Sequence, residues 1–398
     1  MPADKKTLFI FLSHPIQHFI PWFQAMNARL DGGLKVYYAS RHGLDIAHDP
    51  EFNESFSWDM DLLAGYPHEF LNESGHTGGP NKGFMGIHFP GIYSLLKQER
   101  PTAVMIFGWL FAGYWEVAHA ASQLQIPYIL RGESNLLNRG NELKWWIKDK
   151  TIGHLCRGAA ACLAIGQRNA ELYKAYGVSE NRIKQAPYFV DNDLFSRESN
   201  KLNPSKNQLR KKLGLPEDSI VFLFMGKLIN KKHPDHLLQA WSGLPENLRN
   251  KSAILMVGNG SMMDELRLLA GGKNHIAFSG FLNRKELMEA YTASDVLVLP
   301  SDEGETWGLV VNEAMASGLP VIVSDRVGCA PDLVINGKTG YTFRFGEIKE
   351  LQNIMSAILQ NPNSIKVMGD YAAEYIKFAN ADNAGLEVKK ILESLTAK

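Results

Sequence analysis

The strongest constraint on the fold of this chain is a regular alternation between short apolar runs and longer amphipathic stretches. Short apolar runs of this kind are typical of buried parallel strands, and the amphipathic stretches between them are typical of helices. Their alternation predicts a doubly wound α/β fold, in which helices cover both faces of a parallel sheet. In the first half we expect strands at 8–12, 35–39, 103–108, 128–131 and 161–165, with helices at 19–30 and 113–124.

The alternation stops once and then starts again, which predicts a second domain of similar size. Residues 196–218 are polar and contain two prolines, so we expect a linker and then a helix that opens the new domain. Ligands of such sheets bind beyond the carboxyl ends of the strands, so two facing domains predict a site in the cleft between them. The second series of strands is expected at 220–225, 253–257, 275–279, 296–300 and 320–324, and 369–395 has a helical pattern.

Composition excludes several classes of protein. The 398 residues include 42 Lys plus Arg and 42 Asp plus Glu, which excludes a basic field over the whole surface that would attract nucleic acid. Three cysteines, Cys156, Cys162 and Cys329, are too few for a disulfide framework or a four-cysteine zinc site and indicate a reducing compartment. No apolar stretch reaches the ~18 residues of a membrane span. We therefore expect a cytoplasmic protein.

The segment LPSDEGETWGLVVNEAMASG carries the clearest chemical signal. A helix that begins near Gly308 would offer the backbone N–H groups of Trp307, Gly308 and Leu309 to a phosphate. Glu305 and Glu313 flank that phosphate position, and carboxylates are good acceptors for the hydroxyls of a ribose or of a transferred sugar. The alternative is that these acidic residues only complement the dipole of the helix.

Two glycine-containing loops follow other expected strands. In FLFMGKLINKK a strand ends at Gly226, and Lys227, Lys231 and Lys232 crowd the following loop, where ammonium groups would suit a diphosphate. A solvated basic loop is the alternative. The segment VGNG, which contains Gly258, lacks the third glycine and the downstream acidic residue of a dinucleotide fingerprint and therefore indicates a tight turn.

Together these segments resemble the C-terminal donor domain of the retaining glycosyltransferases of family 4, which belong to the GT-B group. The chain matches the paired-glutamate motif of that family and its glycine–arginine–leucine–x3–lysine motif, although lysine stands at position 227 in place of the usual arginine. Further blocks follow in the family's order, so the resemblance covers roughly residues 160–345. The matching residues and blocks are Glu305 and Glu313, then Gly226, Lys227, Leu228 and Lys232, then 176–195, 280–301 and 327–343.

The resemblance implies a GT-B protein, with two Rossmann-like domains that face each other across a cleft. It places an acceptor-side domain at 1–195, a linker and nucleotide-sugar-binding domain at 196–374, and a C-terminal helix at about 375–398 that packs back on the first domain. It also implies that Glu313 holds the nucleotide ribose and Glu305 the donor sugar. The resemblance assigns the diphosphate to Lys227 and Lys232, and the rest of the donor site to Gly226, Gly258, Trp307, Gly308 and Leu309.

Members of the family need no metal or other cofactor, because lysines and a helix dipole stabilise the leaving diphosphate. We therefore expect the nucleotide sugar to be a co-substrate and no metal to take part. Asp59-Met60-Asp61 and Asp191-Asn192-Asp193 fit the Asp-x-Asp pattern of metal-dependent transferases, but we do not expect either to bind a metal.

The loop after the first strand departs from the commoner family pattern. Many relatives have a glycine pair there, whereas this chain has SHPIQHFIP. In this loop His14, Gln17 and His18 could donate hydrogen bonds at the cleft, and the alternative is a packed loop. We expect His18 to join Glu305 and Lys232 as a catalytic residue.

The ends of two later strands also differ from many relatives, because no histidine stands there. Trp109, Arg131 and Glu133 are the candidates for contacts in the cleft at these ends. A buried structural ion pair between Arg131 and Glu133 explains those two residues equally well.

The sequence thus predicts a retaining glycosyltransferase that moves a sugar from a uridine diphosphate sugar to a hydroxyl of a glycan, a lipid-linked sugar or a small molecule. A sugar-nucleotide epimerase of the same architecture and a non-catalytic nucleotide-sugar-binding protein are the alternatives. Residues 142–157 form a basic stretch with two tryptophans, and such a helix can lie on the inner face of an anionic membrane. The alternative there is a helix with one face in the core and a solvated basic face.

Overall fold

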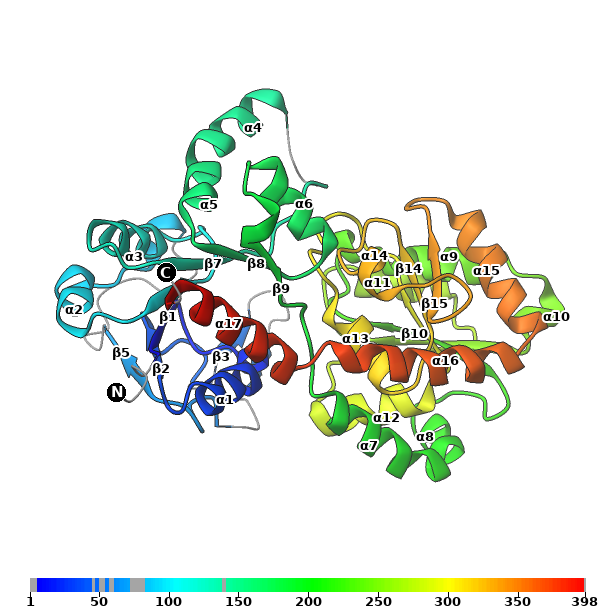
Figure 1. The fold of residues 1–398 in the computed structure, drawn as a ribbon. Helices are drawn as coiled ribbons and strands as arrows, with labels where there is room; N and C mark the ends of the chain where they lie inside the picture. Colours follow the sequence, from blue (N-terminus) through cyan, green and yellow to red (C-terminus); the bar gives the residue numbers. More distant parts are fainter. Residues whose placement is uncertain are drawn as a thin grey trace. The chain divides into compact units, whose positions relative to one another are not determined.

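The computed structural model describes residues 6–44, 47–49, 54–56, 61–71, 83–137 and 141–396. It divides into two compact units, each built around its own parallel sheet (Figure 1). The first unit contains the described residues up to Tyr188 together with those from Ala379 onward, and the second runs from Phe189 to Phe378. Among the described residues no helix is both long enough and apolar enough to cross a membrane.

The described part of the first unit has a seven-stranded parallel sheet in the order β5-β2-β1-β6-β7-β8-β9. Its five central strands lie where the apolar runs predicted them. Sequence patterning missed β5 and β9, because both are short and mostly polar. The strands are β1 (Leu8–Leu12), β2 (Leu34–Tyr38), β5 (His68–Phe70), β6 (Ala103–Ile106), β7 (Tyr128–Arg131), β8 (Ala161–Ala164) and β9 (Ile183–Gln185), with a separate antiparallel pair, β3 (Ala47–Asp49) and β4 (Glu54–Phe56).

Helices connect these strands, and the last helix of the chain returns to this unit. Helix α17 (Ala381–Thr396) packs against α1 (Ile20–Arg29), where Arg29 pairs with Asp382 (Figure 1). The other helical elements are η1 (Gln17–Phe19), η3 (Phe84–Gly86), α2 (Ile92–Glu99), α3 (Ala112–Gln123), α4 (Glu142–Lys148), η4 (Asp149–Gly153), α5 (His154–Gly158), α6 (Gln167–Ala175) and η5 (Glu180–Arg182).

The second unit has a six-stranded parallel sheet in the order β12-β11-β10-β13-β14-β15. The strands are β10 (Ile220–Met225), β11 (Ser252–Val257), β12 (Ile276–Gly280), β13 (Val296–Leu299), β14 (Val321–Ser324) and β15 (Gly340–Phe343). The helical elements are α7 (Asn192–Leu202), η6 (Asn203–Ser205), α8 (Lys206–Lys212), η7 (Asn230–Lys232), α9 (Pro234–Ser242), α10 (Glu246–Arg249), α11 (Met263–Ala270), α12 (Arg284–Ala293), α13 (Leu309–Ala316), α14 (Ala330–Leu333), α15 (Ile348–Gln360), α16 (Asn363–Tyr375) and η8 (Ile376–Phe378).

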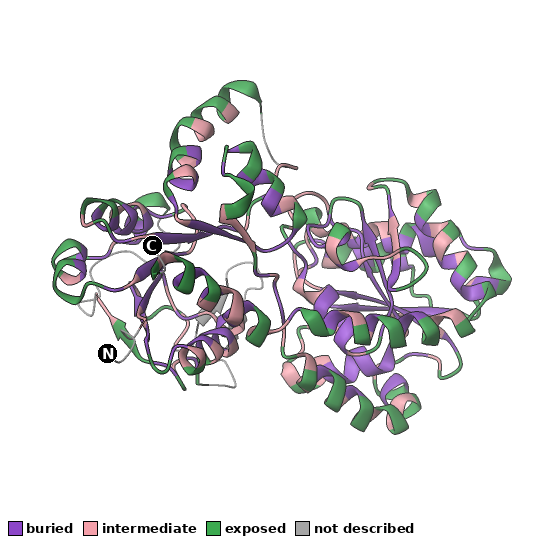
Figure 2. Ribbon diagram, in the orientation of Figure 1, coloured by how far each residue is buried: buried purple, intermediate pink, exposed green. Residues whose placement is uncertain are grey.

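The cores lie on both faces of the sheets, and the central strands are buried over most of their length (Figure 2). Strand β13 has the sequence VLVL, and all four of its side chains are fully buried. Continuous apolar runs of this kind are expected where helices cover both faces of a parallel sheet. The buried core of the second unit includes Phe222, Phe224, Leu237, Trp241 and Ile254.

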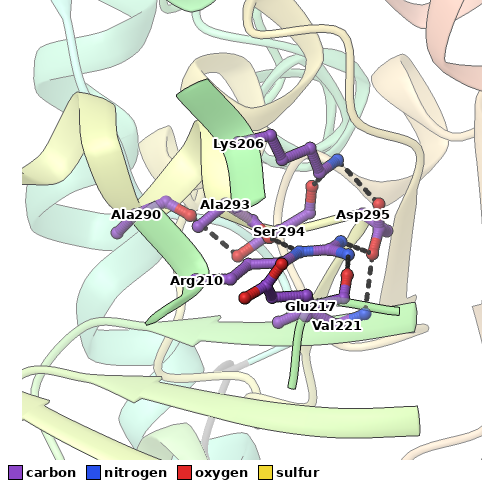
Figure 3. Close-up of polar contacts among 8 residues, drawn as sticks. All are labelled: Lys206, Arg210, Glu217, Val221, Ala290, Ala293, Ser294 and Asp295. Carbon is purple, nitrogen blue, oxygen red and sulfur yellow. Dashed lines mark hydrogen bonds and ion pairs between the residues drawn. The ribbon is translucent and has the colours of Figure 1, made fainter. Parts of the chain in front are cut away.

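The polar segment 196–218, expected to be a linker and a helix, forms most of α7 and all of α8 and belongs to the second unit. Asp295 anchors it by accepting hydrogen bonds from Lys206 Nζ at 2.7 Å, Arg210 Nη2 at 2.5 Å and Val221 N at 2.7 Å (Figure 3). Arg210 also donates to the carbonyls of Glu217 and Ala293. These contacts fix the segment to the second unit, and the two units divide at 188–189, whereas the expected boundary is at 195.

Candidate functional site

Three loops that carry the sequence motifs lie at one edge of the second sheet. They follow β10, β11 and β13, and β10 is the strand between the other two. The carboxyl ends of parallel neighbours meet at the same edge, so their loops are brought together there. The sheet therefore assembles residues that are far apart in the sequence.

The loops after β10 and β11 touch through their backbones. Gly226 has φ +144° and donates from its N–H to the carbonyl of Val257 at 3.0 Å. Gly258 has φ +127°, and a Cβ atom at this position would lie 1.9 Å from the Gly226 carbonyl oxygen. Gly258 is thus needed for the close approach of the loops, whereas Gly226 is favoured by its positive φ, because a Cβ atom there would lie 3.9 Å from its nearest neighbour, Lys232 Cε. The tight turn inferred at Gly258 fits this geometry.

Lys232 and Glu305 form an ion pair between the β10 and β13 loops. Their side chains are only 16% and 13% exposed, and Ser301 Oγ lies 3.5 Å from the same Glu305 oxygen. The backbones of the two loops are also joined, because Asp302 N donates to the carbonyl of Lys231 at 3.0 Å. The structure therefore places the candidate phosphate ligand and the candidate sugar ligand in direct contact.

Helix α13 begins beside this ion pair. Gly308 precedes the helix with φ +96°, and a Cβ atom there would lie 3.0 Å from Leu299 Cδ2 and 3.6 Å from Glu305 Cγ. The first-turn N–H groups from Leu309 onward thus start next to Glu305, as the spacing predicted. The Trp307 indole is buried and donates to Asn312 Oδ1 at 2.9 Å, so its side chain is not available to a ligand.

Glu313 lies one turn into α13 and has a partner that sequence reasoning missed. Tyr291, buried in α12, donates a hydrogen bond of 2.6 Å to Glu313 Oε2. Loss of water around the carboxylate raises the pKa of Glu313 to about 7, although the Tyr291 hydrogen bond and the charge of Arg284 oppose this shift. An aromatic residue at a helical core position gives no sequence signal for such a role.

In the first unit, the loop after β1 holds its two predicted histidines in neutral form. Ser13 Oγ lies 2.9 Å from His14 Nδ1, and burial together with the nearby His42 lowers the pKa of His14 to about 4. Burial and the charge of Arg131 lower the pKa of His18 to about 3. His18 Nε2 is buried and has no hydrogen-bond partner among the described residues. The remaining candidate in this loop, Gln17, begins η1.

Arg131 and Glu133, at the end of β7, both contact Tyr188. Arg131 is 1% exposed, donates to the carbonyl of Ala186 at 2.9 Å, and lies over the rings of Trp22 and Tyr188 at 4.7 and 4.9 Å. Glu133 accepts a hydrogen bond from the Tyr188 hydroxyl. The burial of Arg131 favours a structural role for it, through aromatic contacts rather than through the ion pair with Glu133 that the sequence suggested.

Trp109 lines an apolar cavity of about 580 Å³ on the first unit. A Cβ atom at position 132 would lie 2.5 Å from Trp109 Cζ3, which shows how closely the indole packs on the segment after β7. The cavity is lined by Phe84, Trp109, Trp115, Lys150, Thr151, Ile152 and His154.

Of the two Asp-x-Asp sequences, one has a structural explanation. Asp191 caps α7, because its side chain accepts a hydrogen bond from Leu194 N at 3.0 Å. In the other, Asp59 and Met60 lie outside the described residues.

Comparison with known proteins places this geometry in a family. Residues 205–375 match the family model described as glycosyl transferases group 1. D-inositol 3-phosphate glycosyltransferase 2 of Catenulispora acidiphila is 31% identical over 302 residues, which cover 73% of this chain and 68% of that protein. The sulfoquinovosyl transferase SQD2 of Arabidopsis thaliana is 31% identical over 304 residues, or 72% of this chain and 55% of that protein. The chain thus spans about half the length of several curated relatives that it matches.

Solved structures show the same architecture. Anabaena HepE, crystallised with UDP, aligns over 98% of this chain and 100% of its own with a TM-score of 0.72 and 17% identity. WaaG, a glycosyltransferase involved in lipopolysaccharide biosynthesis, aligns over 98% of this chain and 100% of its own with a TM-score of 0.64 and 17% identity. The fold, two Rossmann-like units with parallel sheets, is that of the GT-B glycosyltransferases. The chain belongs to the family of group 1 glycosyl transferases.

Proposed function

We propose that this protein is a retaining glycosyltransferase that uses a UDP-sugar and a hydroxyl acceptor. The observation that carries the proposal is the Lys232–Glu305 ion pair at the N-terminus of α13, with the Tyr291–Glu313 pair one turn further on. Family membership and the HepE crystals, which contain UDP, UDP with glucose, or UDP-glucose, support a uridine nucleotide.

In this proposal the diphosphate takes the position between Lys232, Lys227 and the N-terminus of α13. Charge-assisted hydrogen bonds and the helix dipole both favour a dianionic group there. Glu313 accepts hydrogen bonds from the ribose, and Glu305 accepts them from the donor sugar. Lys232 and Glu305 are in contact with each other. Lys232 can therefore bind the phosphate on one side of the glycosidic bond while Glu305 binds the sugar on the other side.

During transfer, the bond between the anomeric carbon and the β-phosphate oxygen breaks, and the acceptor oxygen bonds to that carbon on the same face. The electron pair of the broken bond stays on the diphosphate, where the lysines stabilise it. A phosphate oxygen takes the proton of the acceptor hydroxyl, so no side chain has to act as the general base. We assign no metal to this step, and we propose that neutral His18 contributes a hydrogen bond rather than a charge.

We further propose that the acceptor is lipid-linked and that its hydrocarbon part enters the cavity at Trp109. Next to that cavity, α4 exposes Leu143 by 68%, Trp146 by 58% and Ile147 by 49%, whereas Trp145 stacks on Tyr176 at 4.9 Å. Lys144 and Lys148 lie on the same helix, so apolar anchors stand beside basic charge, as in helices that bind anionic membrane surfaces. The protein would then act at the inner face of the membrane.

The test of the function combines binding with product analysis. The full chain is titrated with UDP, GDP and ADP by calorimetry and then incubated with the corresponding sugars, with and without acceptor extracts. We expect UDP binding, release of UDP, and a product with the anomeric configuration of the donor by NMR. Conversion of the donor to an isomeric nucleotide sugar without UDP release would instead identify an epimerase, and binding without any turnover would identify a binding protein.

Membrane contact is tested separately by co-sedimentation with vesicles of phosphatidylglycerol and phosphatidylethanolamine. We expect a Leu143→Ser, Trp146→Ser double variant to lose vesicle binding. Leu268→Ser is the matched control, because Leu268 is 82% exposed on the second unit and should not matter. Equal vesicle binding by all three proteins would exclude α4 as the anchor.

A further inference from the structure

A cluster of two histidines and an aspartate stands directly after Lys232. His233 has the left-handed conformation φ +46°, ψ 50° and precedes α9, whose first turn carries Asp235 and His236. One potential ligand atom from each of these three residues lies within 4.8 Å of the other two. The left-handed residue is the physical reason for the cluster, because it turns the chain so that the His233 ring stacks on His236 with centroids 4.6 Å apart.

Two polar atoms of this cluster are buried without a hydrogen-bond partner among the described residues: Asp235 Oδ1 and His236 Nδ1. The other carboxylate oxygen, Asp235 Oδ2, accepts from Gln239 Nε2 at 3.0 Å, so the orphaned oxygen belongs to a side chain that is already oriented. Leaving a carboxylate oxygen and an imidazole nitrogen unsatisfied is costly, and one cation between them would satisfy both.

The surroundings of His233 favour a metal ligand. Its Nε2 lies 3.6 Å from Asp302 Oδ2, and its Nδ1 lies 4.0 Å from Asp235 Oδ1. A carboxylate on the Nε2 side favours the proton on that nitrogen and leaves the lone pair of Nδ1 directed toward Asp235. Metal-binding histidines commonly have such a carboxylate on their second nitrogen.

Phe345 closes one side of the cluster, with ring centroids 4.8 Å from His233 and 5.5 Å from His236.

We propose that His233, Asp235 and His236 bind one divalent transition-metal ion of the zinc type. Two imidazole nitrogens and one carboxylate oxygen suit Zn²⁺ better than Mg²⁺ or Ca²⁺, which prefer oxygen ligands. Zinc distances of about 2.0–2.2 Å bring ligand atoms to within roughly 3.5 Å of one another, so small side-chain rotations would close the site around the ion. The fourth position is left for water or another ligand.

An ion at this site would connect the loops that lie at the carboxyl ends of the strands. His233 follows Lys232 in the chain and approaches Asp302, which is in the loop that carries Glu305. An ion on His233 would therefore join the β10 loop, the start of α9 and the β13 loop. This inference does not depend on the proposed transferase activity, because it concerns side chains that can be titrated without any nucleotide.

The test uses the full chain after removal of metals with EDTA and dialysis. Zn²⁺ is titrated by calorimetry, and Co²⁺ is titrated by visible absorption, which reports the coordination geometry. We expect one equivalent of Zn²⁺ and a d–d spectrum with Co²⁺. His236→Ala and Asp235→Asn should each weaken binding by at least ~10-fold, and Asp302→Asn by ~10–100-fold, the range for loss of a carboxylate behind a ligand.

His119→Ala is the matched control, because His119 is an exposed histidine on α3 of the first unit. It should bind Zn²⁺ as the unaltered protein does, and circular dichroism of every variant should match that protein as well. Failure of the unaltered protein to bind either ion at ~100 µM, a level far above the affinity of a built site, would overturn the proposal. Equal Zn²⁺ affinity in His236→Ala and His119→Ala would also overturn it.

Discussion

Tyr291 donates a hydrogen bond of 2.6 Å to Glu313 and thereby ties α12 to α13 at the candidate ribose position. The bond holds the carboxylate in one orientation and favours its charged form, whereas the surrounding protein favours the neutral form. With a pKa of about 7, Glu313 changes its charge close to neutral pH. Two pH dependences, of ligand binding and of stability, follow from this one residue.

Glu313→Gln should weaken uridine binding and remove its dependence on pH. Ribose hydroxyls donate to a carboxylate, so binding favours the ionised form, and affinity should rise by up to about tenfold between about pH 6 and pH 8. Calorimetry with uridine avoids titration of phosphate groups. Tyr291→Phe should move the midpoint of this rise to higher pH, because the substitution removes a hydrogen bond that favours the ionised form of Glu313. If the Gln variant still prefers ribose over deoxyribose as strongly as the unaltered protein does, Glu313 does not bind the ribose.

The same carboxyl should make the ligand-free protein less stable as the pH rises. Its pKa is about 7 in the folded protein, against an ordinary value of 4.5 for an exposed glutamate, so between these values the unfolded chain binds fewer protons. The free energy of unfolding should therefore fall over this interval by up to about 3 kcal/mol and level off above it. Urea titrations at several pH values should show this slope in the unaltered protein and a smaller slope in Glu313→Gln.

Lys232→Ala should weaken binding of UDP by ~1.5–3 kcal/mol, because a charge-assisted contact is lost. Uridine, which has no phosphate, should lose far less affinity. Lys251→Ala is the control, because Lys251 is exposed and precedes β11 at the opposite edge of the sheet. If UDP and uridine lose affinity equally, Lys232 does not bind the diphosphate.

Glu305→Ala should lower kcat by ~10²-fold or more, the scale of one well-placed electrostatic contact. The contact to the donor sugar strengthens as the glycosidic bond lengthens, so turnover should suffer more than affinity. Affinity for UDP, which lacks the sugar, should hold within about threefold. Steady-state kinetics measures kcat and calorimetry measures the affinity for UDP. Glu303→Ala, in the same loop, is the control. Normal turnover, or an equal loss of affinity for UDP and for the donor, would show that Glu305 does not contact the donor sugar in the proposed way.

Removal of metals with EDTA should leave sugar transfer essentially intact. Lysines and the N-terminus of α13 supply the positive field for the diphosphate. The ion proposed at His233 contacts no reacting atom, and the two loops that it would join are already connected by the hydrogen bond from Asp302 N to the carbonyl of Lys231. Initial rates are compared before and after chelation and after addition of Mg²⁺, Mn²⁺ or Zn²⁺. A strict requirement for Mg²⁺ or Mn²⁺ would contradict the lysine-based mechanism.

Asp295→Ala should destabilise the second unit by ~3–5 kcal/mol. Asp295 is 15% exposed and balances Arg210, which is 7% exposed, so the substitution leaves a buried guanidinium without its partner. Chemical denaturation measures the loss, and Asp264→Ala, at an exposed position of α11, should change stability by less than about 0.5 kcal/mol. A loss as small as that of Asp264→Ala would show that the network in Figure 3 contributes little.

Fold class was accessible from sequence because buried parallel strands are continuous apolar runs. The runs at β1, β10 and β13 left no other assignment, whereas β5, β9 and β15 were missed because short or partly polar edge strands resemble loops. Sequence patterning predicts a linker in part of 196–218 because its polar residues, Lys206 and Arg210 among them, give no sign of the single buried carboxylate that pairs with both.

The sequence by itself determined which residue types stand at the strand ends: two glutamates, several lysines and the glycines at 226, 258 and 308. Local chain geometry suffices for this, because a helix start and a strand end are encoded by neighbouring residues. Only the tertiary structure decided which of these groups meet. The contacts of Lys232 with Glu305, of Tyr291 with Glu313, and of His233 with Asp302 depend on strand order and on the packing of the loops. No spacing in the sequence expresses either of these, because they arise only when the sheet and its loops close together.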